Sequence, residues 1–333
     1  MRKLLVIVII AALAYAGYWF VGARTAQNAM ATWFDERRAE GWVADYSDLN
    51  TAGFPSRFDT TITDLELADP QTGLAYTAPF LQLFALSYRP NHLIAVWPPS
   101  QSFATPDAGT VTITSADMRA SLKFKPSTSL ELDTTNFEGK TLEVTSPQGT
   151  TKIGAVQIAA RGTATRVNTY DFYASSQNVA LPQGLRQQLD PAQLLPAELR
   201  DMIIDATLEF DRPWDRFAIE DQRPQPTSIQ IKLVDAGWGD ITIKATGDLQ
   251  IDPDGTPTGD LAIKADNWQQ ILALAETAGI LPGRARPLAE TMLNAVAGLS
   301  GNPNSIDAPL SFKNGFVSLG PLPLGRAPKI QLR

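Results

Sequence analysis

The sequence predicts a mainly β chain (β-rich α+β): a large curved antiparallel sheet, half-barrel or sandwich with a few short helices, preceded by one N-terminal transmembrane helix. Three observations support this fold class. An uncharged apolar run occupies residues 4–23, period-two alternation of apolar and polar residues recurs from residue 42 onward, and helical patterns are few and lie late in the chain. Alternation indicates strands with one buried and one wet face, which is typical of antiparallel sheet.

The first segment has the length and composition of a membrane-spanning helix. Arg2 and Lys3 precede "LLVIVIIAALAYAGYWFVGA", and the next charge is Arg24. As a helix, residues 4–23 extend about 30 Å, the thickness of the hydrocarbon core. We therefore interpret residues 1–23 as a transmembrane anchor or signal-anchor. The alternative is a cleaved secretory signal, because "AYA" (14–16) followed by Gly17 fits an A-x-A cleavage site.

The charges around this segment predict its orientation. Two cations at the N-terminus favour a cytoplasmic N-terminus, so the protein is expected to be a single-pass inner-membrane protein with its C-terminal domain in the periplasm. Residues 24–41 are rich in helix formers and predict a helical stalk, with Met30, Trp33 and Phe34 on one face. Residues 42–333 then form the exported β-rich domain, with a weak subdivision near 220–228, where "EDQRPQPTS" is rich in Pro.

Clear strand patterns occur at 118–124, 229–233, 241–251 and 261–265. The stretch "DPDGTPTG" (252–259) predicts a hairpin between two of them. In "SRFDTTITDLELADP" (56–70) the apolar residues change phase, which predicts a bulge near Thr63–Asp64.

Helices are expected at 266–279, after an Asp or Asn cap and before Gly279, and at 286–298, with Pro287 in the first turn. A weaker helical segment at 191–203 is interrupted by Pro196. Three short helices cannot cover the apolar face of a dozen strands. The sheet must therefore curl on itself, pack on a second sheet, or hold something apolar.

Composition removes several classes of function. The chain has no cysteine, which excludes disulfides, a thiol nucleophile and cysteine-ligated metals. Its net charge is −7 and its cations are scattered, so no nucleic-acid partner is expected. Neither a Walker loop nor a dinucleotide fingerprint is present, and we expect no cofactor and no metal site.

Candidate catalytic groups are sparse. His92, the only histidine, stands in "YRPNHLIAVWPP" after a Pro-Asn turn, with Ser87 and Ser100 close in sequence. Carboxylates at Asp211, Asp215, Glu220 and Asp221 alternate with arginines in "FDRPWDRFAIED", which is typical of a solvated, salt-bridged surface. We expect a strand-start histidine and a surface charge cluster; the alternative is a hydrolase that uses His92 or the carboxylates in 211–221.

Inward positions of the sheet are the candidate ligand-binding residues. Alternation places Leu122, Ile243 and Leu249 on apolar faces, and Trp97 ends an apolar run. We predict that these four residues face a hydrophobic ligand, if the sheet interior holds one.

The stretches "AGFPSRFDTTITDLELADP" (52–70) and "APFLQLFALSYRPNHLIAVWPPSQ" (78–101) resemble a bacterial envelope family, domain-of-unknown-function family 2125. The resemblance spans nearly the whole chain and implies export and inner-membrane anchoring. That family carries no assigned activity, so the resemblance supplies no catalytic residues. More loosely, 247–281 and 310–325 are similar to the ending of AsmA-like envelope proteins, which implies a curved β-sheet groove and lipid handling, although this chain is much shorter than the bridging members.

Together these observations predict a membrane-anchored periplasmic envelope protein that is not an enzyme and that binds lipid or another hydrophobic ligand on a curved sheet, or aids envelope assembly. The first alternative is a structural or scaffolding protein that binds other envelope proteins. The second is the hydrolase described above.

Overall fold

The structure is a computed structural model that describes residues 1–220, 223–279, 281 and 283–332. These residues form two compact units. Unit 1 comprises Met1–Pro126 and Glu138–Pro147, and unit 2 comprises Ser127–Phe137 and Gln148–Arg333. Twenty strands are found in the described residues, and the pairings given below are all antiparallel. The predicted mainly β fold class is confirmed: a long apolar N-terminal helix precedes a large antiparallel sheet along the chain.

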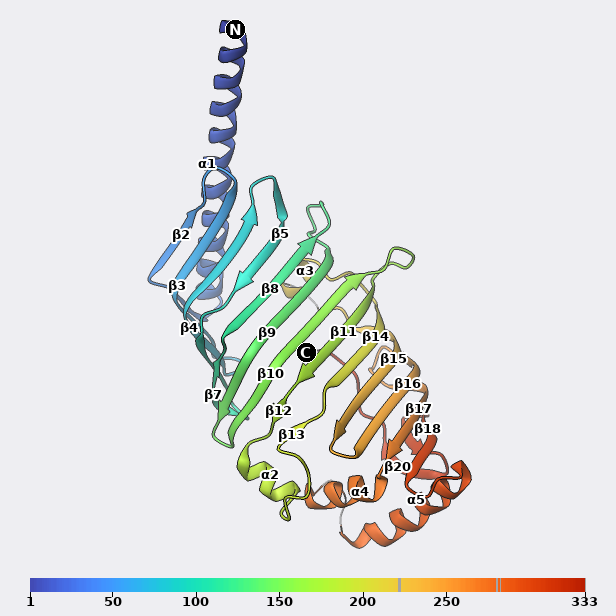
Figure 1. Ribbon diagram of the computed structural model, residues 1–333. Coiled ribbons are helices and arrows are strands. Elements are labelled where there is room, and N and C mark those ends of the chain that lie inside the picture. The colour runs from blue at the N-terminus through green and yellow to red at the C-terminus, as the bar shows by residue number, and fades with distance from the viewer. Residues whose placement is uncertain (221–222, 280, 282, 333) are drawn as a thin grey trace. The chain divides into compact units, whose positions relative to one another are not determined.

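Unit 1 consists of one long helix and a set of antiparallel strands (Figure 1). Strand β3 pairs with β1, β2 and β4, β4 pairs with β5 and β6, and β5 pairs with β8. Strand β7 joins β6 to the second half of β9. The elements are α1 (Arg2–Ala39), β1 (Val43–Asp45), β2 (Asp48–Ala52), β3 (Arg57–Asp69), β4 (Leu74–Leu86), β5 (Arg89–Val96), β6 (Ser100–Thr105), β7 (Gly109–Thr114), β8 (Asp117–Phe124) and β9 (Leu132–Ser146), whose first residues belong to unit 2.

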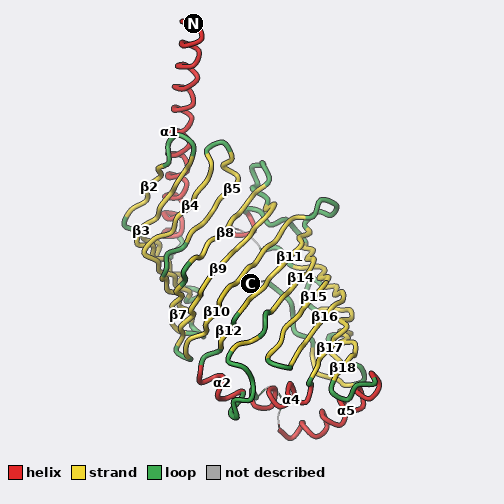
Figure 2. Tube along the Cα trace, viewed as in Figure 1, coloured by secondary structure: helices red, strands yellow, loops and turns green. Residues whose placement is uncertain are grey.

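Unit 2 is an antiparallel meander with most of its helices at one end (Figure 2). Its strands pair in the order β10–β11–β14–β15–β16–β17–β18–β19–β20, and the short β12 and β13 pair beside β10. The elements are β10 (Gly149–Gly162), β11 (Thr169–Gln177), β12 (Val179–Ala180), α2 (Gln183–Leu189), β13 (Glu198–Leu199), β14 (Met202–Phe210), α3 (Phe217–Glu220), β15 (Pro226–Trp238), β16 (Ile241–Ile251), β17 (Pro257–Asp266), α4 (Trp268–Thr277), a 3-10 turn (Gly283–Ala285), α5 (Arg286–Ser300), β18 (Ser305–Lys313), β19 (Phe316–Leu319) and β20 (Leu322–Arg326).

The alternating segments form the strands that they predict. Residues 118–124, 229–233, 241–251 and 261–265 lie in β8, β15, β16 and β17, and a hairpin joins β16 to β17 at 252–256. The predicted bulge is wrong, because Thr63 pairs with Phe80 and Leu65 with Ala78, so the register is the same on both sides of Asp64 and no extra residue is inserted. The change of phase is instead associated with the left-handed backbone of Asp64, which has a φ of 50° and lies between the buried residues Ile62 and Leu65.

Gly247 is a position where only glycine fits the sheet. Its φ is 146°, and a Cβ there would lie 2.3 Å from the carbonyl oxygen of Asp260 on the adjacent strand. Residues other than glycine rarely adopt this conformation. Gly247 therefore allows β16 and β17 to stay paired in the middle of their apolar face.

Two of the three expected helices form. Helix α5 has Pro287 in its first turn, and α4 is followed by Gly279 with a φ of 75°. The residue before α4 is Asn267, but its side chain makes no capping bond and donates to the carbonyl of Asp240 instead.

The expected helix at 191–203 is wrong. The helix in this region is α2, which ends at Leu189, and 202–210 forms β14. Two features prevent helix formation between them. Pro191 and Pro196 break the pattern, and the carboxylate of Asp190 accepts hydrogen bonds from the backbone N–H groups of Leu194 and Leu195, at 3.0 and 2.7 Å, which fixes a loop.

Helix α1 is continuous from the predicted anchor (residues 1–23) into the predicted stalk (24–41) and ends at Ala39, and its second half packs on the strands of unit 1. Trp19 and Ala23 contact Phe58, and Phe34 packs in a buried cluster with Ala44, Leu49, Ile62 and Leu65. The predicted apolar face is confirmed, since Met30 and Trp33 border this cluster. The weak subdivision near 220–228 stays a prediction, because residues 221 and 222 lie outside the described residues.

We predict that Phe34→Ala lowers the free energy of unfolding by about 3–5 kcal/mol, because it empties a fully buried aromatic site between α1 and the sheet. The measurement is denaturant unfolding of the full chain in detergent. Thr32→Ala is the control on the exposed side of the same turn and is expected to change stability by less than about 0.5 kcal/mol. An equal effect of both changes would mean that α1 does not pack on the sheet.

Candidate functional site

One face of the unit 2 sheet is apolar across many strands. The register places Ile158, Ala174, Ile204, Val234 and Ala245 directly opposite one another, from β10 through β11, β14 and β15 to β16. Cross-strand partners point to the same side of a sheet, so these five side chains form one row. Further cross-strand sets on the same face are also apolar: Ala160, Phe172, Ala206 and Ile231, and then Ala236, Ile243, Ala265 and Ile306.

This apolar face is packed at one end and open at the other. Near β17 and β18 it is covered, because Ala265, Ile306 and Ala308 pack against Trp268 of α4 and Val296 of α5. Toward β10 and β14 it is accessible: Ile204 is 42% exposed and Ile158 is 39% exposed. Single exposed apolar side chains are ordinary on protein surfaces, but adjacent ones in register form a patch, and such patches mark interaction sites.

The C-terminal segment closes part of the same face. Ile330 packs on the cluster of Leu249, Ile251 and Leu261, and its N–H donates to the carbonyl oxygen of Gly255 at 2.8 Å. Lys329 binds the carboxylate of Asp254 in the β16–β17 hairpin at 2.7 Å. The chain beyond β20 is thereby fastened across the ends of β16 and β17.

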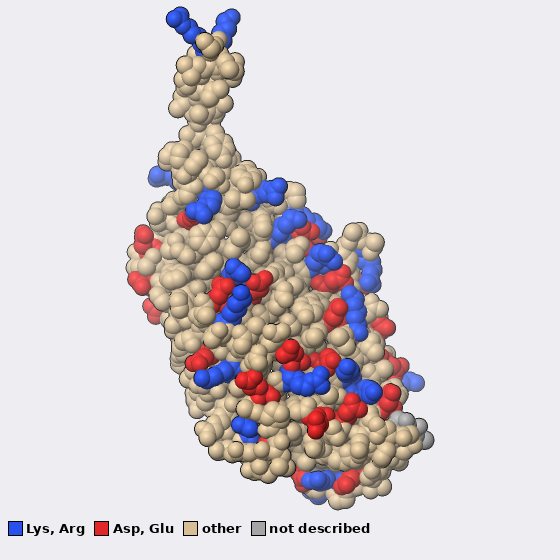
Figure 3. Space-filling model, viewed as in Figure 1, with Lys and Arg blue, Asp and Glu red and all other residues tan. Residues whose placement is uncertain are grey.

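The opposite face of the unit 2 sheet is charged. Lys232 lies 2.8 Å from Asp171 and 3.6 Å from Asp205. The hydrogen bond from Lys232 lowers the pKa of Asp171, with a smaller contribution from the Thr207 hydroxyl, and the same bond raises the pKa of Lys232. Figure 3 shows acidic and basic side chains intermixed over the strands of this unit. The sheet therefore has one wet side and one apolar side.

The four residues that the sequence assigns to ligand contact fall into both units. Leu122 pairs with Leu93 on a half-buried face of unit 1, and Trp97 is half-buried after β5, where its N–H donates to the carbonyl of Met118. In unit 2, Ile243 is 36% exposed, whereas Leu249 is packed against Ile330 and is only 4% exposed. Ile243 therefore lies on the accessible part of the apolar face, Leu249 lies in its packed part, and the role of all four in ligand contact stays a prediction.

Ile158 and Ile204 were not singled out from the sequence, although the signal is present. The stretches "AVQIAA" (155–160) and "MIIDATLEF" (202–210) alternate in the same way as the other strands. Alternation shows that a face is apolar, but it does not show which part of that face a helix or the chain terminus covers.

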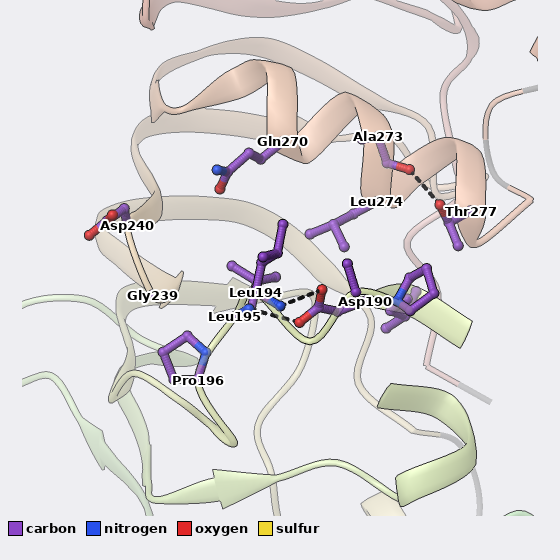
Figure 4. A pocket seen from close by; sticks show the side chains of 13 residues that line it. Asp190, Leu194, Leu195, Pro196, Gly239, Asp240, Gln270, Ala273, Leu274 and Thr277 are labelled. Atoms are coloured by element: carbon purple, nitrogen blue, oxygen red, sulfur yellow. Dashed lines mark hydrogen bonds between the residues drawn. The ribbon is translucent and has the colours of Figure 1, made fainter. Parts of the chain in front are cut away.

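Unit 2 also contains an apolar pocket of about 480 Å³ between the loop after α2 and helix α4 (Figure 4). Its apolar lining includes Leu189, Leu194, Leu195, Ala273 and Leu274. The bonds of Asp190 to the Leu194 and Leu195 N–H groups hold one rim in place. A pocket of this size and character suits a small hydrophobic molecule or part of an acyl chain.

His92 forms a cross-strand contact. Its Nε2 lies 2.8 Å from the Ser121 hydroxyl, on the neighbouring strand β8. Ser87 does not take part: it is fully buried, and its hydroxyl bonds the carbonyl of Pro55 and the Tyr15 hydroxyl. Both residues lie within paired strands, whereas the nucleophile of α/β-hydrolases lies on a strained turn between a strand and a helix.

The described carboxylates in 211–221 bind the local backbone. Asp211 accepts a hydrogen bond from the N–H of Gln225 at 2.7 Å, and Asp215 accepts from the N–H groups of Phe217 and Ala218 at the start of α3. Asp221 lies outside the described residues, as does the side chain of Glu220. In the part of the chain that the structure describes, no three His, Asp or Glu side chains are grouped so that they could hold a metal ion.

A family model described as "Uncharacterized protein conserved in bacteria (DUF2125)" matches residues 19–328. The chain belongs to this family. Its matched region begins at Trp19 in α1 and therefore includes the part of the helix that packs on unit 1. Neither the curated proteins nor the solved structures contain a match to the chain.

The attachment of the C-terminal segment is expected to depend on pH. The hydrogen bond from Lys329, followed by that from Thr256, lowers the pKa of Asp254 from 3.8 to about 2. A carboxylate with a lowered folded-state pKa contributes stability above its unfolded pKa and loses it as the pH falls through the folded value. Protection of the Ile330 amide from hydrogen exchange should therefore be constant above about pH 4 and fall toward pH 2.

The control is Lys329→Met, which removes the partner of Asp254 and keeps the apolar stem of the side chain. In this variant the Ile330 amide should be less protected at neutral pH, and the step between pH 4 and pH 2 should shrink. An unchanged step would show that Asp254 does not fasten this segment.

Proposed function

We propose that this protein is a single-pass inner-membrane protein that presents its β-rich part to the periplasm and binds lipid, or another hydrophobic ligand, on the open apolar face of unit 2. The observation that carries the proposal is the row of apolar side chains in register from Ile158 to Ala245, with Ile158 and Ile204 exposed. An acyl chain laid across this row gains about 0.8 kcal/mol for each buried CH₂ group.

Membrane anchoring is supported by α1. The helix is long and apolar enough to span a membrane, with a mean hydropathy of 2.4 over 18 residues, and only 6% of that window is buried. A signal sequence satisfies the same criteria. Retention of this helix in the mature protein is favoured because the Tyr15 hydroxyl bonds the Ser87 hydroxyl at 2.9 Å. Cleavage after Ala16 would remove this contact to the folded chain.

The absence of catalysis belongs to the same proposal. His92 is engaged with Ser121, and Asp211 and Asp215 accept hydrogen bonds from the backbone nearby. These contacts give each group a structural role. Among the described residues that form these contacts, no nucleophile is paired with a base that a third group orients.

The direct test is photocrosslinking in intact cells. A photoreactive amino acid at Ile204 should yield adducts with lipid in the full-length protein, because this position is on the open apolar face. The matched control is the adjacent isoleucine, Ile203, which points to the opposite side of β14. Adducts are identified by mass spectrometry after purification.

Each result decides between functions. Lipid adducts at position 204 and not at 203 support the proposal, and Ile204→Glu should then abolish co-purified lipid while Ile203→Glu retains it. Adducts of 204 with another envelope protein would favour the scaffolding alternative. Equal labelling at the two positions, or none at either, would refute a ligand on this face.

The non-enzymatic part has its own test. His92→Ala and Asp215→Ala should leave the envelope phenotype of the cell unchanged, measured as resistance to detergent and dye in a deletion strain complemented with each variant. Each change should cost only about 0.5–2 kcal/mol of stability, since it removes a single polar contact or a helix-capping interaction. Loss of complementation by a variant that still accumulates at wild-type level would point to the hydrolase alternative.

A further inference from the structure

Helix α1 contacts the folded part of unit 1 well inside its own apolar run. The uncharged residues are 4–23, yet the Tyr15 hydroxyl already bonds Ser87. The Tyr18 hydroxyl donates to the carbonyl of Ser87 at 2.6 Å, and the Trp19 indole N–H donates to the carbonyl of Arg57 at 2.7 Å.

The free part of the helix is too short to cross a membrane by itself. Residues 4–14, which precede the first of these contacts, extend about 16 Å at 1.5 Å per residue, roughly half of the 30 Å hydrocarbon core. If α1 spans the membrane, residues 15–23 must also lie within it or in its interface. The loops of unit 1 that touch those residues then lie at the same depth.

Those loops carry exposed aromatic side chains. Phe54, in the loop between β2 and β3, is 53% exposed and stacks on Phe20 of α1, with the Trp19 ring edge-on to it. Tyr88, in the turn between β4 and β5, is 62% exposed. We call Tyr18, Phe20, Phe54 and Tyr88 the aromatic collar. Tyr and Trp are enriched at the membrane–water interface because they combine an apolar ring with a polar group, and the wholly apolar rings of Phe20 and Phe54 suit the adjacent acyl region.

Several backbone carbonyls of these loops are paired within the protein. The carbonyl of Gly53 accepts from the N–H of Arg57, that of Ser56 accepts from the N–H of Ser87, and that of Pro55 accepts from the Ser87 hydroxyl. The carbonyls of Arg57 and Ser87 accept from Trp19 and Tyr18 of the helix. Backbone groups that enter a bilayer must be paired within the protein, and these loop carbonyls meet that requirement.

Basic side chains lie next to the collar. Arg24 ends the apolar run, Arg89 opens β5, and the Arg57 side chain is 58% exposed although it pairs with Asp59 at 2.8 Å. Figure 3 shows basic side chains where α1 meets the strands of unit 1, and at the far tip of the helix. Long cationic side chains at this level reach lipid phosphates while their stems stay in apolar surroundings.

We propose that the β2–β3 loop (53–56) and the β4–β5 turn (87–88) of unit 1 sit in the headgroup and upper acyl region of the lipid bilayer around α1. The partner of this surface is the bilayer itself, and the proposal rests on the membrane anchoring proposed above. Unit 1 then rests on the membrane, and residues 24–39 continue away from the membrane as a helix packed on the sheet.

Because the chain has no cysteine, single-cysteine labelling tests this directly. The variants Phe54→Cys, Tyr88→Cys, Val8→Cys and Gln71→Cys carry a small fluorophore in the full-length protein, which is reconstituted into phosphatidylethanolamine–phosphatidylglycerol vesicles. Quenching is measured with lipids that carry a spin label on the acyl chain and, separately, with iodide in water. Gln71 is the aqueous control, since it lies in the β3–β4 turn, a whole strand length from the collar. Phe54, Tyr88 and Gln71 are exposed, so these three changes should not disturb folding.

Labels at 54 and 88 should be quenched by the lipid spin label several-fold more than the label at 71, and less by iodide. If the labels at 54 and 88 are quenched like the label at 71 while the label at Val8 is quenched by lipid, membrane anchoring is supported and the insertion of the loops into the bilayer is refuted. If Val8 is also accessible to iodide, or is missing from the mature protein, the anchoring itself fails and the insertion of the loops fails with it.

Discussion

The packing of α1 on the first strands of unit 1 is the constraint on which the rest of this arrangement depends. Trp19, Ala23 and Phe34 meet Phe58 and the cluster around Ile62. Gly22 allows this approach, because a Cβ there would lie 2.7 Å from the Phe58 ring. Each large apolar side chain buried in this way contributes about 1.5–3 kcal/mol. A helix that looks like an anchor followed by a linker is therefore also part of a hydrophobic core, which fixes the depth at which the loops of unit 1 meet the bilayer in our proposal.

Strand register gives unit 2 its two different sides. Because side chains alternate along each strand, antiparallel pairing from β10 to β18 collects aliphatic residues on one side and the ion pairs of Lys232 on the other. Helices α4 and α5 and the segment around Ile330 cover only part of the apolar side. The uncovered part costs solvation free energy unless something apolar occupies it, and this cost is the physical basis for proposing a lipid ligand.

Polar side chains in this protein mostly serve the fold. Asp190 shapes the loop at the apolar pocket, Asp215 binds the start of α3, and Asp254 holds the C-terminal segment through Lys329. In each case the carboxylate is already engaged by a neighbouring group of the protein. The family match carries no activity with it, so the proposed function rests on the geometry of the apolar face.

The sequence by itself determined the mainly β fold class, the apolar N-terminal helix, the strands of β8 and β15 to β17 and the change of phase near Asp64, because these follow from local periodicity. It failed at 191–203, where apolar residues suggested a helix but prolines and the Asp190 bonds produced a loop and a strand. Only the tertiary structure decided which apolar positions are buried: Leu249 lies under Ile330, whereas Ile204, with the same alternation, stays open. Coverage of a face depends on segments distant in the chain, such as residue 330 against residue 249, and no local pattern encodes that contact.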